Sequence, residues 1–234
     1  MLQHIMTIAA DNGNKQFMVL EQIAANVANL NTAGYKARRF EQYLFQDNRL
    51  EGIQRVDTTT GAPMRTGREL DIAIKGEGFI PVTQPDGKVA YTRDGSLTKN
   101  SDGYLMTQRG DLVGNGIQLP LNYKKLRIHP DGTVDVLIKD QQAPQVVGKI
   151  QLVRFANAEG LESIGNNKLV PTGNSGQPEP LTDVLLEQGA IERSNVNIHS
   201  QIDQILRLNA SLISNFRIIK FTDDIFRQAV NLKQ

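Results

Sequence analysis

The chain has 234 residues, with 26 lysines and arginines against 25 aspartates and glutamates, and it contains no cysteine. The formal net charge of +1 argues against nucleic acid as a partner, because binding driven by counterion release needs a clustered basic surface. The lack of cysteine excludes disulfides, thiol catalysis and thiolate metal ligands. No stretch reaches the roughly 18 apolar residues that a membrane-spanning helix needs, so we do not expect an integral membrane protein.

Residues 2–30 have the apolar spacing of a helix that packs against a second helix. The stripe is clearest near its end, at spacings of three, four and three: Leu20, Ile23, Val27 and Leu30. Asn26 and Asn29 lie beside the stripe, where amide groups can bond a partner backbone while the seam stays apolar. Asp11 to Asn14 should interrupt the helix, because asparagine and glycine lower helix propensity.

The helix should end near Gly34, which is free to adopt a positive φ angle. The string Asn-Val-Ala-Asn-Leu-Asn-Thr-Ala-Gly-Tyr-Lys at residues 26–36 resembles the amino-terminal signature of the bacterial flagellar axial proteins, the family of rod and hook subunits. Ala33 stands where that signature often has proline, which removes a φ restraint but leaves Gly34 and Tyr35 in place. The alternative interpretation is an ordinary amphipathic helix with a glycine stop.

The segment after this signature is basic and then apolar. Lys36, Arg38 and Arg39 are three charges in four residues, which is more typical of a solvated turn than of a binding patch. Residues 38–46 resemble the short segment that leaves the first helix in rod proteins. The alternative is a local core helix, because Phe40, Tyr43 and Leu44 have helical spacing.

From about Gly61 the apolar period changes to two, and Leu70, Ile72 and Ile74 predict a half-buried strand. Five dipeptides that favour the positive φ angles of tight hairpins follow: Asp86-Gly87, Asp94-Gly95, Asp102-Gly103, Asn115-Gly116 and Asp131-Gly132. Strands at this spacing predict a compact antiparallel β domain. Residues 70–79, 91–111 and 155–176 also resemble the middle domain of rod and hook proteins.

A search for chemistry finds no catalytic, metal or cofactor site. Gly76-Glu77-Gly78 is half of a dinucleotide fingerprint, but the third glycine position holds Pro81. The loop from Thr98 to Arg109 lacks the acidic first ligand and the final glutamate of a calcium loop. Three histidines share no motif spacing: His4, His129 and His199. Asp223 and Asp224 are adjacent on a predicted helix and therefore point apart.

The carboxy-terminal part predicts the second helix. Residues 188–197 resemble the family's carboxy-terminal signature, and Ser194 or Asn195 can cap the helix that follows. The next residues are spaced four and three without a break: Ile198, Ile202, Ile205, Asn209, Leu212, Phe216, Ile219, Asp223, Phe226 and Val230. They predict a coiled-coil seam with two polar members. Ala210 and Leu212 replace the family's usual arginine and tyrosine, so the resemblance is to a divergent member.

We therefore predict an α+β protein, in which both chain ends form a terminal-helix coiled-coil domain beside a central, mostly β domain of short antiparallel strands. The predicted parts are an amino-terminal assembly segment with its linker at 1–60, a β-rich domain at 61–180 and a carboxy-terminal assembly segment at 181–234. Single helices of this length are marginal in water, so we expect the free subunit to be folded in the middle and loose at both ends.

The resemblance implies a non-enzymatic structural subunit of the flagellar basal-body rod, which polymerises through its terminal helices into a helical tube that transmits torque to the hook. It implies that the partners are copies of this chain, other rod and hook subunits and the flagellar export apparatus. Residues 1–11 lack the basic start and apolar core of a cleavable signal, and the resemblance instead implies export through the flagellar channel. The predicted assembly interface comprises Leu20, Ile23, Asn26, Val27, Asn29, Leu30, Gly34, Tyr35, Asn195, Ile198, Ile202, Ile205, Asn209, Leu212, Phe216, Ile219 and Phe226.

A competing interpretation is a cell-surface, β-rich binding module with helical arms. Aromatic side chains clustered on one exposed β face would favour it. The candidates for such a cluster are Tyr91, Tyr104 and Tyr123.

Overall fold

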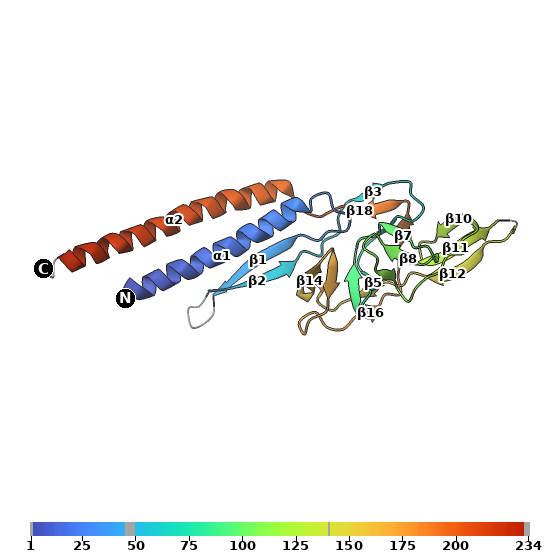
Figure 1. Ribbon diagram of the computed structural model, residues 1–234, viewed down its shortest axis with the longest axis horizontal. Coiled ribbons are helices and arrows are strands. Elements are labelled where there is room, and N and C mark those ends of the chain that lie inside the picture. Colours follow the sequence, from blue (N-terminus) through green and yellow to red (C-terminus); the bar gives the residue numbers. More distant parts are fainter. Residues whose placement is uncertain (1, 45–49, 140, 232–234) are drawn as a thin grey trace. The chain divides into compact units, whose positions relative to one another are not determined.

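The computed structural model describes residues 2–44, 50–139 and 141–231 (Figure 1). The chain divides into two compact units. We call the first, which comprises Met1–Ala28, Arg38–Gln54 and Val196–Gln234, the helical unit. We call the second, which comprises Asn29–Ala37 and Arg55–Asn195, the β unit.

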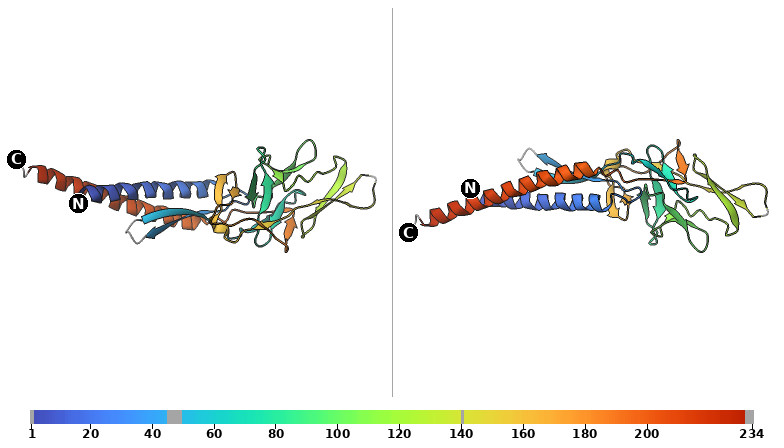
Figure 2. Two further views of the ribbon diagram at one scale, coloured as in Figure 1. Left: turned by 90° about the horizontal axis from the view of Figure 1, so that it is seen from below. Right: turned by 90° about the horizontal axis from the view of Figure 1, so that it is seen from above.

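The helical unit is built on two long helices, α1 (Leu2–Ala28) and α2 (Ile198–Asn231). They lie side by side and run in opposite directions (Figures 1 and 2). The predicted interruption at Asp11–Asn14 is wrong, because α1 is continuous through these residues. Packing on α2 outweighs their low propensity: the Asn215 amide donates to the Ala9 carbonyl at 2.9 Å, and Gly13 is half-buried.

A two-stranded sheet follows α1, formed by β1 (Arg38–Leu44) and β2 (Leu50–Val56). The alternative of a local core helix here is therefore wrong for residues 38–44, while residues 45–46 lie outside the described residues. The Asn26 side chain accounts for the difference, because it bonds both the N–H and the carbonyl of Arg38, each at 2.9 Å. The sequence predicts strands only from about Gly61, but the first strand, β1, begins at Arg38.

The β unit consists of short strands. They are β3 (Pro63–Arg65), β4 (Ile72–Ile74), β5 (Ile80–Thr83), β6 (Val89–Thr92), β7 (Leu97–Lys99), β8 (Leu105–Thr107), β9 (Leu112–Val113), β10 (Tyr123–Ile128), β11 (Thr133–Ile138), β12 (Gln145–Lys149), β13 (Val153–Arg154), β14 (Glu162–Gly165), β15 (Lys168–Val170), β16 (Glu179–Pro180), β17 (Leu186–Gln188) and β18 (Ala190–Glu192), with a 3-10 turn, η1 (Ala158–Gly160).

The largest sheet has the strand order β14-β15-β6-β5-β9-β8-β7, and β10-β11-β12 form a second one. The pairs β13-β16, β17-β4 and β18-β3 are two-stranded. The strands pair antiparallel. Together with the contact between the terminal helices, this topology confirms the predicted α+β class.

Most of the predicted turns have the expected backbone. Gly87, Gly103, Gly116 and Gly132 all have positive φ angles between 82° and 87°. Gly95 does not belong to this set, so the hairpin expectation is wrong there. That glycine is needed for close packing instead, because a Cβ atom on it would lie 1.8 Å from the Ile72 carbonyl oxygen.

The β unit has two apolar clusters. The larger is formed by fully buried aliphatic residues that include Ile72, Ile80, Val82, Leu105 and Leu152. The smaller contains three aromatic rings, in which Phe155 makes edge contacts with Phe79 and Tyr91 at centroid distances of 5.8 and 4.9 Å.

The placement of the tyrosines weakens the binding-module interpretation. Tyr91 is buried, whereas Tyr104 and Tyr123 are half-buried. These three residues therefore do not form the exposed aromatic cluster that a binding face would need. Among the described residues, neither helix is long and apolar enough to span a membrane.

Candidate assembly interface

The contact line between α1 and α2 is largely polar. Gln16 Nε2 donates to Ser211 Oγ at 2.6 Å, and Asn26 Nδ2 donates to Gln201 Oε1 at 3.0 Å. Asn26 is completely buried in this position. Ile23 and Leu208 supply buried apolar contacts beside these bonds. Because a buried side-chain amide needs a defined partner, the buried Asn26–Gln201 pair favours one register of the two helices.

The face of α2 that is buried differs from the predicted seam by one position. Its members recur every seven residues: Gln201, Leu208 and Thr222 are buried, and Asn215 is half-buried. Each comes one residue before a member of the predicted seam, namely Ile202, Asn209, Phe216 and Asp223. Part of the predicted seam, including Ile202, Asn209 and Phe216, is therefore exposed. Leu212 and Ile219 are half-buried and face α1 across the groove between the helices.

The predicted interface residues of α2 divide by exposure. The exposed ones are Ile202, Ile205, Asn209, Phe216 and Phe226, and the half-buried ones are Ile198, Leu212 and Ile219. On α1, Leu20 and Val27 are exposed, whereas Ile23 is buried. Leu30 is half-buried and belongs to the β unit.

Several large exposed side chains of α1 and α2 were not among the predicted interface residues. They are Met6, Ile8, Phe17, Met18, Leu206, Ile213, Ile218 and Phe221. Phe17 could have been found from the spacing, because Phe17, Leu20, Ala24 and Val27 also recur at three, four and three. Met6 continues the stripe of Leu20, at spacings of three and four. The remaining side chains do not continue a predicted stripe, so a search for one seam passes over them.

Four of the predicted interface residues lie in segments of the β unit and not in the contact between α1 and α2. They are Asn29, Gly34, Tyr35 and Asn195. Asn29 Oδ1 accepts a hydrogen bond from Thr32 Oγ1 at 3.0 Å just past the end of α1. Gly34 has a φ of +65°, and a Cβ atom on it would lie 2.4 Å from the backbone of Arg93 and Asp94. Tyr35 is buried.

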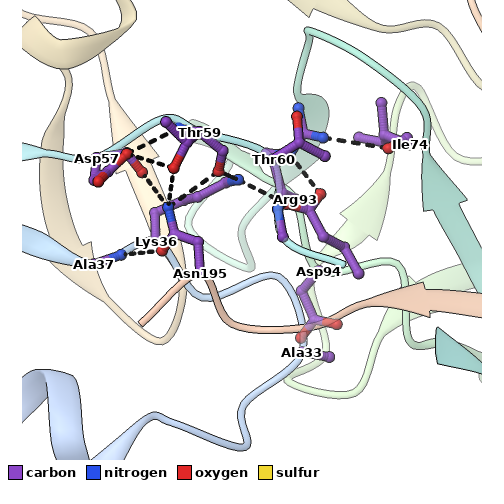
Figure 3. Close-up of polar contacts among 12 residues, drawn as sticks. Ala33, Lys36, Ala37, Asp57, Thr59, Thr60, Ile74, Arg93, Asp94 and Asn195 are labelled. Atoms are coloured by element: carbon purple, nitrogen blue, oxygen red, sulfur yellow. Dashed lines mark hydrogen bonds and ion pairs between the residues drawn. The ribbon is translucent and has the colours of Figure 1, made fainter. Parts of the chain in front are cut away.

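Asn195 joins three segments of the β unit (Figure 3). Its Oδ1 atom accepts from the Ala37 N–H at 2.7 Å, and its Nδ2 atom donates to the carbonyls of Asp57 and Thr59 at 2.8 and 3.0 Å. The predicted capping role of Ser194 or Asn195 is wrong. The cap of α2 is Asn197, whose Oδ1 atom accepts from the N–H groups of His199 and Ser200.

A buried ion cluster lies in the same part of the β unit. Glu192 Oε1 accepts from Lys36 Nζ at 2.6 Å, and its Oε2 atom accepts from Arg93 Nε at 2.7 Å. All three side chains are almost completely buried. The expectation that Lys36 belongs to a solvated turn is therefore wrong, although Arg39 is exposed. Each of the three residues lies in a different segment that resembles the rod and hook family, but no local pattern shows that they meet.

The remaining polar atoms of the cluster are well satisfied. Lys36 Nζ also donates to the Thr59 carbonyl at 2.6 Å, and Arg93 donates to the carbonyls of Gly78 and Gly76 at 2.8 and 3.0 Å. Burial removes the Lys36 ammonium group from water and lowers its pKa, a shift that the neighbouring Glu192 carboxylate opposes. One carboxylate thus compensates the charges of two buried cations. Because Lys36, Arg93 and Glu192 come from three different segments, their ion pairs hold these segments together.

Among the described residues, no group of three or more histidines, aspartates or glutamates is arranged to hold a metal ion. The helical unit thus has a polar contact between α1 and α2 with exposed apolar side chains beside it, and the β unit has a buried ion cluster that joins three of its segments.

Comparison with known proteins finds similarity over nearly the whole chain. A family model described as the D1 domain of the flagellar hook proteins FlgE, FlgF and FlgG matches residues 73–136. The flagellar basal-body rod protein FlgG of Caulobacter vibrioides is 33% identical over 99% of this chain and 100% of its own length. FlgG of Bacillus subtilis is 31% identical over 95% and 97% of the two chains, and the rod protein FlgF of C. vibrioides is 33% identical over 90% of each.

Proposed function

Because the chain belongs to the family of flagellar basal-body rod proteins, we propose that it polymerises through α1 and α2 with copies of itself and with other rod and hook subunits. The chain is a structural, non-enzymatic component of the basal-body rod. The proposal concerns which surfaces make the contacts and which partners they meet.

The observation that carries the proposal is the distribution of exposed apolar side chains. Most of the large apolar side chains that the described residues expose lie on the two helices of the helical unit, among them Phe17, Leu206, Phe216 and Phe221. Soluble monomers rarely expose contiguous apolar patches of more than a few hundred Å². The exposed faces of α1 and α2 are therefore suited to contact other subunits.

The energy of such contacts is sufficient for assembly when several residues act together. Burying one leucine or phenylalanine side chain contributes about 1.5–3 kcal/mol. Association costs an estimated 4–15 kcal/mol in lost translational and rotational freedom, before side-chain ordering. Single apolar contacts are thus too weak, whereas several side chains together, such as Leu20, Val27, Ile202, Ile205 and Phe216, contribute an amount of the same order as this cost.

The predicted interface residues take different parts in this proposal. The exposed apolar residues and Asn209 contact neighbouring subunits, while Ile23 and Asn26 hold α1 against α2 within one subunit. Gly34, Tyr35 and Asn195 shape the segments that lead to the helices. Residues 1–60 and 181–234 act as assembly segments around the central domain at 61–180.

We further propose that the subunit reaches the growing rod through the flagellar export apparatus. There it joins a helical tube that transmits torque to the hook. The support for this route is the family membership of the chain. Loose helices in the free subunit would suit transport through a narrow channel, because unpaired helices are marginal in water.

Electron microscopy of basal bodies from cells that lack the gene tests the proposal. We expect rods that end early and no motility, with both restored by the unaltered gene. Phe216→Ser, at an α2 side chain that is 65% exposed, should restore rods poorly, whereas Leu121→Ser, at a 70% exposed side chain of the β unit, should restore them fully. Intact, motile flagella in the deletion strain would overturn the proposal.

A further inference from the structure

The turn after β9 contains one of the two Asn-Gly pairs in the sequence, Asn115-Gly116. The other pair, Asn12-Gly13, lies within the helix α1. Asn115 is exposed, and Gly116 is half-buried with a φ of +85°. An exposed asparagine amide thus directly precedes the backbone N–H of a glycine that lies in a turn.

The two ends of this turn are firmly held, whereas its tip is held by one long bond. Before the tip, the Gly114 N–H donates to a carbonyl of β5 at 2.8 Å, and after it the Ile117 carbonyl accepts from an N–H of β8 at 2.8 Å. The Gly116 N–H donates to the Val113 carbonyl at 3.2 Å, at the long end of the range for such bonds. Breaking this bond frees the Gly116 nitrogen, and a local opening of this kind does not require the strands to unfold.

The surroundings of Gly116 leave room for its backbone to move. A Cβ atom added to this glycine would meet the Tyr104 ring at an ordinary contact distance of 3.7 Å. By contrast, a Cβ atom added to Gly103 would lie 2.2 Å from the Leu119 carbonyl oxygen. Gly103 is also buried, and its carbonyl accepts from the Leu119 N–H at 2.8 Å. Of these two turn glycines, Gly116 is therefore the one that can change its backbone conformation locally.

We propose that Asn115 is a site of spontaneous deamidation in the folded chain. The Gly116 nitrogen, once water or hydroxide has taken its proton, forms a bond to the side-chain carbonyl carbon of Asn115, Cγ. The bond between Cγ and Nδ2 breaks, and Nδ2 takes up a proton from water and leaves as ammonia, so that a cyclic imide remains. A glycine in the second position favours this ring, because no Cβ atom obstructs the attack. Water is the co-reactant, and asparagine is among the residues that are chemically lost on heating.

Water then opens the imide at one of its two carbonyl carbons. Opening at Cγ gives aspartate, which adds a negative charge to the turn. Opening at the main-chain carbonyl carbon gives isoaspartate, in which the main chain runs through Cβ and Cγ and is longer by one carbon atom. This extension falls two residues before Ile117, whose side chain is 7% exposed in the larger apolar cluster. Isoaspartate therefore disturbs the core of the β unit, whereas aspartate changes its surface charge.

A second Asn-Gly pair in the β unit provides a matched comparison. Asp102→Asn creates it at an exposed position directly before the buried Gly103. The purified, full-length variant is incubated at neutral pH and digested with trypsin, and mass spectrometry with fragmentation follows the acid forms of peptides 100–109 and 110–124. In the folded chain, the acid form should appear several-fold faster at position 115 than at position 102. In urea the two rates should become similar, because neither glycine is then held in a turn.

Two further measurements keep the test decisive. In the unaltered chain, the rate at Asn115 should differ by no more than a few-fold between the folded state and urea. Asn115→Gln should remove the acid form of peptide 110–124, which also contains Gln118 and Asn122.

The proposal is overturned by equal rates at the two positions in the folded chain, or by a difference that persists in urea. Strong protection of Asn115 by folding would also overturn it, as would an acid form of peptide 110–124 that survives Asn115→Gln. Circular dichroism before the incubation verifies that each variant is folded. These outcomes do not bear on the rod function, which the deletion strain tests separately.

Discussion

Lys36 and Glu192 lie 156 residues apart in the sequence and form a 2.6 Å ion pair whose side chains are 3% and 2% exposed. Glu192 is bonded equally closely to Arg93, at 2.7 Å. The pair joins the segment that follows α1 to the segment that precedes α2, both within the β unit. The β unit is therefore complete only when residues from both ends of the chain are in place.

Glu192→Gln should destabilise the β unit by about 3–5 kcal/mol, because it leaves Lys36 and Arg93 buried without a compensating charge. Urea unfolding followed by circular dichroism measures the change. The matched control is Glu187→Gln, at a carboxylate that pairs with Lys75 at 2.9 Å on the surface. A loss no larger than that of the control would show that the cluster contributes little.

Stability at alkaline pH should report on Lys36. Its pKa in the folded chain lies below the ordinary lysine value of 10.5, so between these two values the unfolded chain binds more protons than the folded one. The free energy of unfolding therefore gains a contribution that rises with pH in this window. Subtracting the curve of Lys36→Met from that of the unaltered chain isolates this rise. A pH-independent difference would contradict it.

Gly34→Ala should be more damaging than an alanine at another glycine with a similar backbone. Gly67 has a φ of +72° with no atom within 4 Å of an added Cβ, whereas at Gly34 that atom would lie 2.4 Å from the Arg93 and Asp94 backbone. Gly67→Ala measures the conformational cost alone, about 1–2 kcal/mol. Thermal unfolding of both variants separates the two effects, and equal losses would rule out the steric one.

Two asparagine-to-leucine substitutions should behave oppositely. Asn26→Leu removes side-chain bonds to both backbone groups of Arg38, and we expect a loss of about 2–4 kcal/mol in unfolding free energy. Asn209→Leu changes an exposed position and should alter that free energy by less than about 0.5 kcal/mol. It should instead make subunit association tighter but less specific, because polar seam residues commonly set register. Unchanged assembly geometry and strength would remove any register role for Asn209.

Two deletions test whether the β unit folds independently. Removing residues 2–28 should leave its thermal transition nearly unchanged and abolish rod assembly. Removing residues 2–37 should prevent the transition, because Lys36 and Tyr35 belong to the β unit. Identical transitions in the two chains would show that the segment at 29–37 is dispensable.

Hydrogen exchange on the purified, full-length chain tests the expectation of loose ends. The amides of the β unit should exchange slowly, whereas those of α1 and α2 should exchange at near random-coil rates until assembly. Strong protection along both helices in a monomer would mean that their polar contact is stable without a neighbour.

The sequence alone determined the features that depend on residues close together in the chain. The apolar spacing located both long helices, although α2 begins at Ile198, after Asn197 rather than after the predicted cap at Ser194 or Asn195. Dipeptides such as Asp102-Gly103 located the tight turns, because glycine adopts positive φ without a steric cost. The amino- and carboxy-terminal signatures indicated the family, because each is a short run of neighbouring residues.

The tertiary structure decided what each surface touches. The period of α2 shows an apolar face, but it does not show whether that face is covered by α1 or by another copy. In the structure the contact falls one residue earlier, at Gln201 and Leu208, because side-chain amides on both helices pair there. Lys36, Arg93 and Glu192 carry no local pattern either. Their roles depend on burial and on ion pairs across 99 and 156 residues, which only the folded chain brings together.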